Sequence, residues 1–210
     1  MPRLVTLVHM KRTVEVVLFD LGGVLIELTG VPKMLDLTGM ADATVLWQRW
    51  LACPWVRKLE TGQCGAADFA AGLVEEWQLR IEPEAFLDAF AQWPVGPLPG
   101  AEELVRAAKR NVAVGCLSNT NELHWRGSIG TWPILDHFDH QFASHEMGLL
   151  KPDTVVFEHV AERLGVAPDR VVFLDDNLAN VEGAAAVGFQ AFHTVGVEQA
   201  RDALTIAGVV

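Results

Sequence analysis

The sequence predicts an α/β protein: a Rossmann-like parallel sheet with helices on both faces, carrying an inserted small α-helical cap. Short apolar runs that end in polar side chains occur at 16–19, 112–117 and 171–174. From residue 112 onward such runs alternate with helical patterns, as in βαβ units. Residues 28–97 instead have helical periodicity throughout. We therefore expect a core made of residues 14–27 and 98–210 and a cap made of 28–97.

The first predicted strand is Val16–Phe19, four apolar residues that lead directly into Asp20. Gly22 and Gly23 follow and free the backbone for a tight turn that can bind an anion. An aspartate before two glycines is usually only a turn residue. The strand therefore indicates a functional site only if further polar groups with complementary chemistry occur later in the chain.

The predicted cap contains apolar residues at helical spacing, for example Leu46 with Trp50 and Phe69 with Leu73 and Trp77. Helix starts are predicted at Ala66–Asp68 and at Pro83. Five tryptophans fall in this region: Trp47, Trp50, Trp55, Trp77 and Trp93. We interpret them mainly as the core of a small helical subdomain, with a minority lining a substrate pocket.

The rest of the chain follows an alternating pattern of strands and helices. After a linker-like turn at 97–100, the expected elements are a helix at 101–110, a strand at 112–117, a short strand at 141–144, a helix at 155–164, a strand at 171–174, a last helix at 181–187 and an apolar run at 189–192. The carboxyl ends of parallel strands meet at one edge of a sheet, where ligands bind. Polar groups that reach or approach this edge are Asp20, Ser118, Asn119, Lys151, Asp175 and Asp176.

These groups suit phosphate chemistry. Carboxylates can hold a divalent metal, and oxygen ligands beside a phosphate favour Mg²⁺ over zinc. A lysine supplies a compact positive charge, while a hydroxyl and backbone N–H groups can bind phosphate oxygens. A carboxylate in such a site can attack phosphorus. The order of the groups therefore indicates a phosphoryl-transfer site with Asp20 at its centre.

Four motifs in this order resemble the haloacid dehalogenase superfamily of phosphohydrolases. They are Phe19-Asp20-Leu21-Gly22-Gly23-Val24-Leu25, Leu117-Ser118-Asn119-Thr120-Asn121, Lys151-Pro152-Asp153 and Phe173-Leu174-Asp175-Asp176-Asn177. The resemblance extends from about residue 14 to 193. The second motif with His124, and the run 175–184, look like the branch of this family that contains bacterial α-D-glucose-1-phosphate phosphatase. The phosphatase domain of soluble epoxide hydrolase is a more distant likeness.

The resemblance implies a magnesium-dependent phosphomonoesterase that acts on a small phosphorylated metabolite, such as a sugar phosphate, through an aspartyl-phosphate on Asp20. It implies that Mg²⁺ is bound by Asp20, the Gly22 carbonyl and Asp176, with Asp175 as a direct or water-mediated ligand. Phosphate would be bound by the 22–23 turn, by Ser118 and by the Asn119 N–H. Lys151 would neutralise the phosphate and assist catalysis, and the cap would exclude water and select the substrate.

One position departs from the family pattern. Most phosphatases of this superfamily carry a second aspartate two residues after the nucleophile, which donates a proton to the leaving alcohol; here the residue is Gly22. Either another group donates the proton or the leaving oxygen is acidic, as in an anomeric phosphate. His124 is a candidate donor, although a structural role is favoured. Two alternatives stay open: a 2-haloacid dehalogenase-type hydrolase and a catalytically silent phosphate-binding or partner-binding module.

Composition excludes several other classes. The net charge of −11 disfavours nucleic acids and anionic membranes as partners. The three cysteines are widely spaced, no apolar stretch approaches a membrane span, and the first residues lack a signal-peptide pattern, so a cytoplasmic protein is expected. Residues 1–13 are interpreted as an N-terminal extension that could add a short strand, and the sequence does not indicate the oligomeric state. A histidine-rich group is interpreted as surface and loop packing rather than a zinc site: Asp136, His137, Asp139, His140 and His145.

Overall fold

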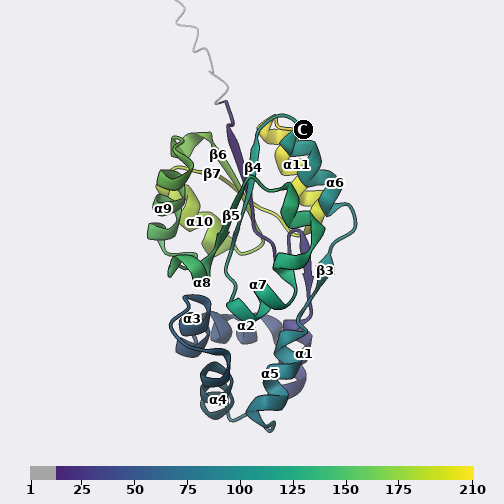
Figure 1. The fold of residues 1–210 in the computed structure, drawn as a ribbon, viewed down its shortest axis with the longest axis vertical. Coiled ribbons are helices and arrows are strands. Elements are labelled where there is room, and N and C mark those ends of the chain that lie inside the picture. Colours follow the sequence, from purple (N-terminus) through teal and green to yellow (C-terminus); the bar gives the residue numbers. More distant parts are fainter. Residues whose placement is uncertain (1–12) are drawn as a thin grey trace, which may run out of the picture.

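The computed structural model describes residues 13–210, so the predicted extension at 1–13 lies almost entirely outside the described residues. A five-stranded sheet with the order β5-β4-β1-β6-β7 forms the centre of the molecule, and all of its strand pairs are parallel (Figure 1). Its strands are β1 (Val16–Phe19), β4 (Ala113–Ser118), β5 (His140–Ala143), β6 (Val171–Asp175) and β7 (Gln190–His193). This arrangement confirms the predicted parallel sheet.

The central strand β1 is completely apolar and buried between its two neighbours. Phe19, its last residue, lies opposite Cys116 of β4 and Leu174 of β6. In a parallel sheet this register brings the residues that follow these positions to the same edge. The carboxyl ends of β1, β4 and β6 therefore meet at one place.

Helices cover both faces of the sheet, as predicted. One face packs against α6 (Ala101–Lys109) and α11 (Gly196–Ala207), and the other against α9 (Thr154–Leu164) and α10 (Leu178–Val187) (Figure 1). Shorter segments connect these layers: α7 (Glu122–Gly127), α8 (Ser144–Met147) and the 3₁₀ turns Ile129–Thr131, Pro133–His137 and Pro168–Arg170. Within residues 13–210, no helix is both long and apolar enough to cross a membrane.

Five further helices gather at the end of the molecule below the sheet edge (Figure 1). They are α1 (Gly30–Thr38), α2 (Ala43–Ala52), α3 (Pro54–Glu60), α4 (Ala66–Trp77) and α5 (Pro83–Ala91). Their interior is a separate hydrophobic cluster centred on Trp50, whose ring lies 5.1–6.2 Å from four other aromatic rings. We call residues 30–91 the helical cap; the domain boundaries at 27/28 and 97/98 stay a prediction.

The structure differs from the expected elements in three places. An unpredicted helix, α11, follows β7, although Val197, Ala200 and Leu204 have the spacing of a buried helix face. Residues 94–97, expected to belong to the helical cap, form strand β3 (Pro94–Pro97), which pairs antiparallel with β2 (Ile26–Leu28) in a two-stranded ribbon. Prolines are tolerated at such edges. Helix α10 begins at Leu178 instead of 181, because the Asn177 side chain caps it through Ala179 N–H.

Candidate active site

Asp20 is the first residue after β1, and its backbone N–H donates a hydrogen bond of 2.8 Å to Leu174 O on β6. This bond continues the sheet ladder by one residue, so the side chain is held rigidly at the strand end. Asp20 is only 8 % exposed. A buried, fixed carboxylate at the carboxyl edge of a parallel sheet is well placed to act on a ligand.

Lys151 is the positive centre of the site, and it is almost completely buried. Its Nζ lies 2.9 Å from Asp20 Oδ1 and 2.7 Å from Asp175 Oδ2, and it donates a third hydrogen bond of 2.8 Å to Leu117 O. The lysine therefore joins residues at the ends of β1, β4 and β6. Its contacts exclude the alternative that Lys151 is only a solvated residue before a helix.

Asp175, the last residue of β6, has no solvent exposure. Besides Lys151, its oxygens accept hydrogen bonds from Asn177 N–H at 2.8 Å and from Asn180 Nδ2 at 2.9 and 3.1 Å. Both oxygens are thus held by protein donors. Asn180 received no role from sequence reasoning, although its position on the first turns of α10, five residues after Asp175, is a signal that could have identified it.

Asp176 is the more exposed member of the acidic pair and lies against the glycine turn. A side chain at Gly23 would place its Cβ 2.1 Å from Asp176 Oδ2, and Gly23 also has a positive φ of 73°. Both facts require glycine at this position. The glycine turn therefore makes the space in which the Asp176 carboxylate approaches the backbone after β1.

Two carboxylates of this site, those of Asp20 and Asp176, resist ionisation. Burial raises the pKa of Asp20 to about 8, an effect that Lys151 opposes and the charges of Asp175 and Asp176 strengthen. Desolvation and the neighbouring Asp175 raise the pKa of Asp176 to about 6. Burial disfavours the Lys151 ammonium, yet Asp175 and Asp20 overcome it and raise the lysine pKa. One lysine does not neutralise three carboxylates, so a further positive charge would stabilise the ionised form of the site.

A divalent cation would supply this positive charge. Among the described residues, the one group of three or more acidic, histidine or cysteine side chains with suitable spacing is Asp20, Asp175 and Asp176, whose ligand atoms lie within 4.8 Å of one another. All of the donors are hard carboxylate oxygens, which suit Mg²⁺. The donor set, its raised pKa values and the space beside Gly23 together fit a magnesium site.

Two of the predicted phosphate-binding residues, Ser118 and Asn119, lie at the end of β4, on the opposite side of β1 from Asp175. Ser118 is the buried last residue of β4. The Asn119 side chain is fully engaged with the loop that carries the lysine: Nδ2 donates to Lys151 O at 2.9 Å, and Oδ1 accepts from Lys151 N–H at 3.0 Å. Asn119 thus positions Lys151, a function that the sequence did not indicate.

Ser144, at the start of α8, holds the next residue of the same loop. Its Oγ accepts from Thr120 N–H and donates to Thr120 O, both at 2.9 Å. This pairing occupies the Thr120 N–H, so that group is not free to bind a phosphate oxygen.

The His124 side chain connects the α/β core to the cap by a hydrogen bond. Asn121 Nδ2 donates to its Nδ1 at 3.2 Å, so its Nε2–H is the donor to Phe90 O of α5 at 2.7 Å. Burial lowers the pKa of His124 to about 4, which keeps the ring neutral. Because both ring nitrogens are engaged, the structure favours the structural role of His124 over proton donation.

Helix α3 brings the cap to the site edge. Arg57 pairs with Asp153 at 2.5 Å, two residues beyond Lys151. One turn later, Glu60 ends the helix, and burial raises its pKa to about 7 while the positive charge of Lys151 lowers it. The sequence analysis assigned Glu60 no role, because nothing in a helical pattern reveals which cap residue will reach a site in the core.

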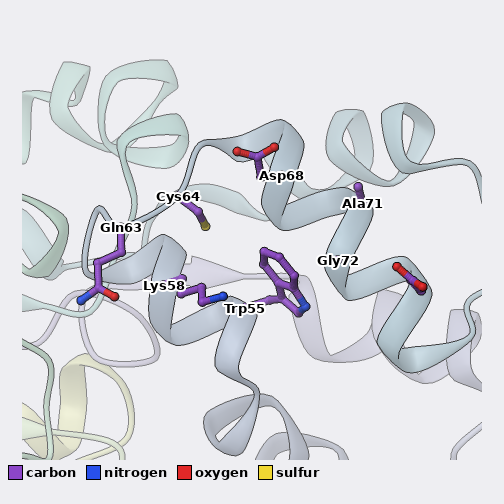
Figure 2. Close-up of a pocket in the computed structure, with 8 residues that line it drawn as sticks. Trp55, Lys58, Gln63, Cys64, Asp68, Ala71 and Gly72 are labelled. Atoms are coloured by element: carbon purple, nitrogen blue, oxygen red, sulfur yellow. The ribbon is translucent and has the colours of Figure 1, made fainter.

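Two hollows flank this end of the cap. One, of about 420 Å³, lies between α3 and α4 within the cap; Figure 2 shows Trp55, Lys58 and Asp68 around it. None of the predicted site residues lines it. The other, of about 500 Å³, is a cleft between cap and core; its lining includes Leu59, Gly62, Glu122, Arg126, His145 and Glu146 and, again, none of the predicted site residues.

The histidine-rich group considered as a zinc site is divided among surface contacts, as the sequence analysis favoured. His137 Nε2 lies 2.9 Å from Glu102 Oε1, and Asp139 pairs with Lys109 at 2.7 Å. Within residues 13–210 these side chains do not converge on a common point that could bind a metal.

The sequence profile of the haloacid dehalogenase-like hydrolases matches residues 14–188. The chain belongs to this family. It is therefore a hydrolase of the haloacid dehalogenase (HAD) type.

Individual relatives divide between two chemistries. The chain is 25% identical over 204 residues to D-ribitol-5-phosphate phosphatase of Bacteroides thetaiotaomicron, covering 90% of this chain and 96% of that protein. It is 31% identical over 186 residues to (S)-2-haloacid dehalogenase 1 of Pseudomonas sp., covering 81% and 80%.

A solved structure has the same fold. It is a HAD family enzyme from Bacteroides thetaiotaomicron in complex with magnesium and inorganic phosphate, with a TM-score of 0.67, 24% identity and coverage of 85% of this chain and 93% of that one.

Proposed function

We propose that this HAD hydrolase is a magnesium-dependent phosphomonoesterase that acts on a small phosphorylated metabolite, a sugar phosphate or a related polyol phosphate. The observation that carries the proposal is the convergence of Asp20, Asp175 and Asp176 around the buried Lys151. That arrangement supplies a nucleophile, a cation site and a fixed positive charge within one strand edge. The similarity to D-ribitol-5-phosphate phosphatase supports the same substrate class.

In the first step, an Asp20 oxygen attacks phosphorus and the bond from phosphorus to the leaving oxygen breaks, which forms an aspartyl-phosphate. Lys151 holds Asp20 in line through its 2.9 Å contact and offers positive charge to the transferring phosphoryl group. Ser118 and the Asn119 N–H bind phosphate oxygens. Water then attacks phosphorus, which releases inorganic phosphate and restores the Asp20 carboxylate.

Mg²⁺ would be held by Asp20, Asp176 and the Gly22 carbonyl, with Asp175 close enough to join directly or through water. When bound, the ion supplies charge neutralisation between the carboxylate and the phosphate. The two oxygens of Asp175 already accept bonds from Lys151, Asn177 and Asn180. Asp175 therefore orients the lysine, whereas Asp176 is free to contribute an oxygen.

The cleft between cap and core suits the organic part of such a substrate. Its lining is rich in polar groups, among them Glu122, Arg126 and Glu146, which match a hydroxylated carbon chain better than an apolar one. We propose that the cap covers the site and selects the substrate through this cleft.

Release of p-nitrophenol from p-nitrophenyl phosphate tests the reaction. The wild-type protein should turn over with Mg²⁺, and Asp20→Asn should lower kcat by roughly 10⁴-fold or more because the nucleophile is lost. Asp202→Asn, an exposed aspartate of the core on α11, is the matched control and should behave like wild type. Turnover no greater than that of Asp20→Asn would favour the catalytically silent module instead.

Metal dependence tests the ligand assignment separately. Asp176→Asn should shift the magnesium titration to concentrations at least about tenfold higher, since one carboxylate ligand is removed. An unchanged titration would assign the metal to other groups.

A dehalogenase is the second candidate, because of the 31% identity to (S)-2-haloacid dehalogenase 1. In that chemistry Asp20 would attack carbon and no metal would be needed. The Asp175–Asp176 pair beside Asp20 favours the phosphatase. Chloride release from (S)-2-chloropropionate without added metal, in the absence of phosphatase activity, would reverse this preference.

The leaving group offers a test of substrate class. If an acidic leaving oxygen compensates for Gly22, sugar 1-phosphates should exceed sugar 6-phosphates in kcat/KM. An equal or reversed preference would show that the protein supplies the proton itself.

A further inference from the structure

The position two residues after Asp20 is Gly22, which has no side chain to donate a proton to the leaving alcohol. Space around it is also restricted, since a Cβ there would lie 2.6 Å from Leu28 Cδ1. His124 is engaged at both ring nitrogens and Lys151 is held as an ammonium by two carboxylates. The proton for an alcohol leaving group must therefore come from another part of the molecule.

The end of α3 is the part of the cap that is attached to the lysine loop. Arg57, exposed on this helix, pairs with Asp153, and Gly62, just past the helix, packs so closely on α8 that a Cβ there would lie 2.6 Å from His145 O. Thr61 Oγ1 donates to Arg57 O at 2.7 Å and closes the last turn. Glu60 lies between these two anchors, so its backbone is fixed over the site edge.

Glu60 also belongs to the chain segment that lines the cleft proposed to receive the organic part of the substrate. Leu59 and Gly62, on either side of it in the chain, both line that cleft, and Glu60 itself is half-buried. Lys151 is close enough for its charge to act on the Glu60 carboxyl. Glu60 therefore stands on the stretch of the cap that joins the lysine loop, through the Arg57–Asp153 pair, to this cleft.

Burial gives the Glu60 carboxyl a pKa that suits proton donation. The pKa of Glu60 is raised to about 7 by burial, with Lys151 opposing the rise, so a large fraction is protonated near neutral pH. A proton donor is most effective when its pKa lies near the working pH. Glu84, another glutamate of the cap, is exposed in the first turn of α5.

We propose that Glu60 is the general acid and base of this enzyme and replaces, from the cap, the aspartate that the chain lacks at Gly22. The proposal rests on the phosphatase function proposed above. As Asp20 attacks phosphorus, the electron pair of the breaking bond goes to the leaving oxygen, which takes the Glu60 proton and departs as an alcohol. When water attacks the aspartyl-phosphate, its proton goes to the Glu60 carboxylate, and the electron pair of the phosphorus–Asp20 bond returns to Asp20.

Leaving groups of different acidity test this role. With an alkyl phosphate such as ribitol 5-phosphate, Glu60→Gln should lower kcat/KM by roughly 10²-fold, the range of general acid catalysis. With p-nitrophenyl phosphate, whose leaving group departs without a proton, kcat/KM should fall by less than about threefold. Glu60→Asp should recover part of the loss for the alkyl ester, and Glu84→Gln, the matched control, should leave both substrates unaffected.

The outcomes separate this proposal from the phosphatase assignment. If the wild-type protein hydrolyses neither ester with Mg²⁺, the phosphatase proposal itself fails. If it hydrolyses both and Glu60→Gln leaves them unchanged or lowers them equally, only the role of Glu60 is overturned, because a structural residue affects both leaving groups alike. A loss confined to the alkyl ester, in a variant that still processes p-nitrophenyl phosphate, supports the proposal.

Discussion

The interior of the α/β core and the interior of the helical cap contain different kinds of side chains. Below the strand ends of the α/β core, Asp20, Lys151 and Asp175 are buried as charged or ionisable groups in direct contact. The interior of the cap is almost entirely apolar and is centred on the rings around Trp50. Both regions lie within the same chain and meet at α3 and at His124.

This difference indicates that the buried charges of the core reduce stability, whereas the buried rings of the cap increase it. Burying charges is unfavourable even when they are paired, and natural proteins retain such groups mainly where chemistry requires them. Buried aromatic rings each remove roughly 150–250 Å² of surface from water, which a subdomain as small as the cap needs. We infer that the core interior is organised for reactivity and the cap interior for cohesion.

Lys151→Met should have the largest effect, because it removes the charge that holds two buried carboxylates. We expect turnover to be lost and the free energy of unfolding at pH 7.5, measured by urea denaturation, to fall by about 3–5 kcal/mol. Lys109→Met breaks the exposed pair with Asp139 and should cost less than about 1 kcal/mol. Equal losses in the two variants would show that the buried charges have no special role in stability.

Trp50→Ala tests the cohesion of the cap. Removing the central ring should lower the free energy of unfolding of the cap by about 3–5 kcal/mol, and Trp47→Ala, on the exposed side of the same helix, by only about 0.5 kcal/mol or less. Hydrogen exchange resolves the two regions. Loss of protection confined to residues 30–91 would show that the cap unfolds separately, whereas a uniform loss would show one cooperative unit.

His124 connects the two interiors and makes their junction sensitive to acid. Its pKa is about 4 in the folded protein, below the ordinary value of 6.5, so the unfolded chain binds the proton more tightly between these values. Stability from this group is complete above pH 6.5 and is lost as the pH falls towards 4. Between pH 7.5 and 4.5, wild type should lose about 2–3 kcal/mol more than His124→Gln in urea denaturation. Parallel pH profiles of the two proteins would contradict this assignment.

Arg57→Ala should have the smallest effect. The pair with Asp153 is half-exposed on both sides, so its loss should change the free energy of unfolding by less than about 1 kcal/mol. A loss of several kcal/mol, measured in the same way, would show that the contact between cap and core stabilises the whole protein.

Much of the fold follows from local pattern. The apolar runs at 16–19 and 171–174 alternate with amphipathic helices, and that order defines a parallel sheet covered on both faces. The same pattern places Asp20, Ser118 and Asp175 at strand ends. Helix α11, which the prediction omitted, also has a readable apolar spacing at Val197, Ala200 and Leu204.

Tertiary structure alone decided how these groups are used. Strand register and the turn after α8 bring Lys151 into contact with residues 131 and 24 positions away in the chain, and no local pattern encodes such a contact. The same holds for Asn119, which holds the lysine loop, and for Asn180, which holds Asp175. Glu60 is the clearest case. The sequence by itself determined that an acid is missing at Gly22, but only the packing of α3 on the lysine loop put the half-buried Glu60 carboxyl where we propose that it supplies the proton.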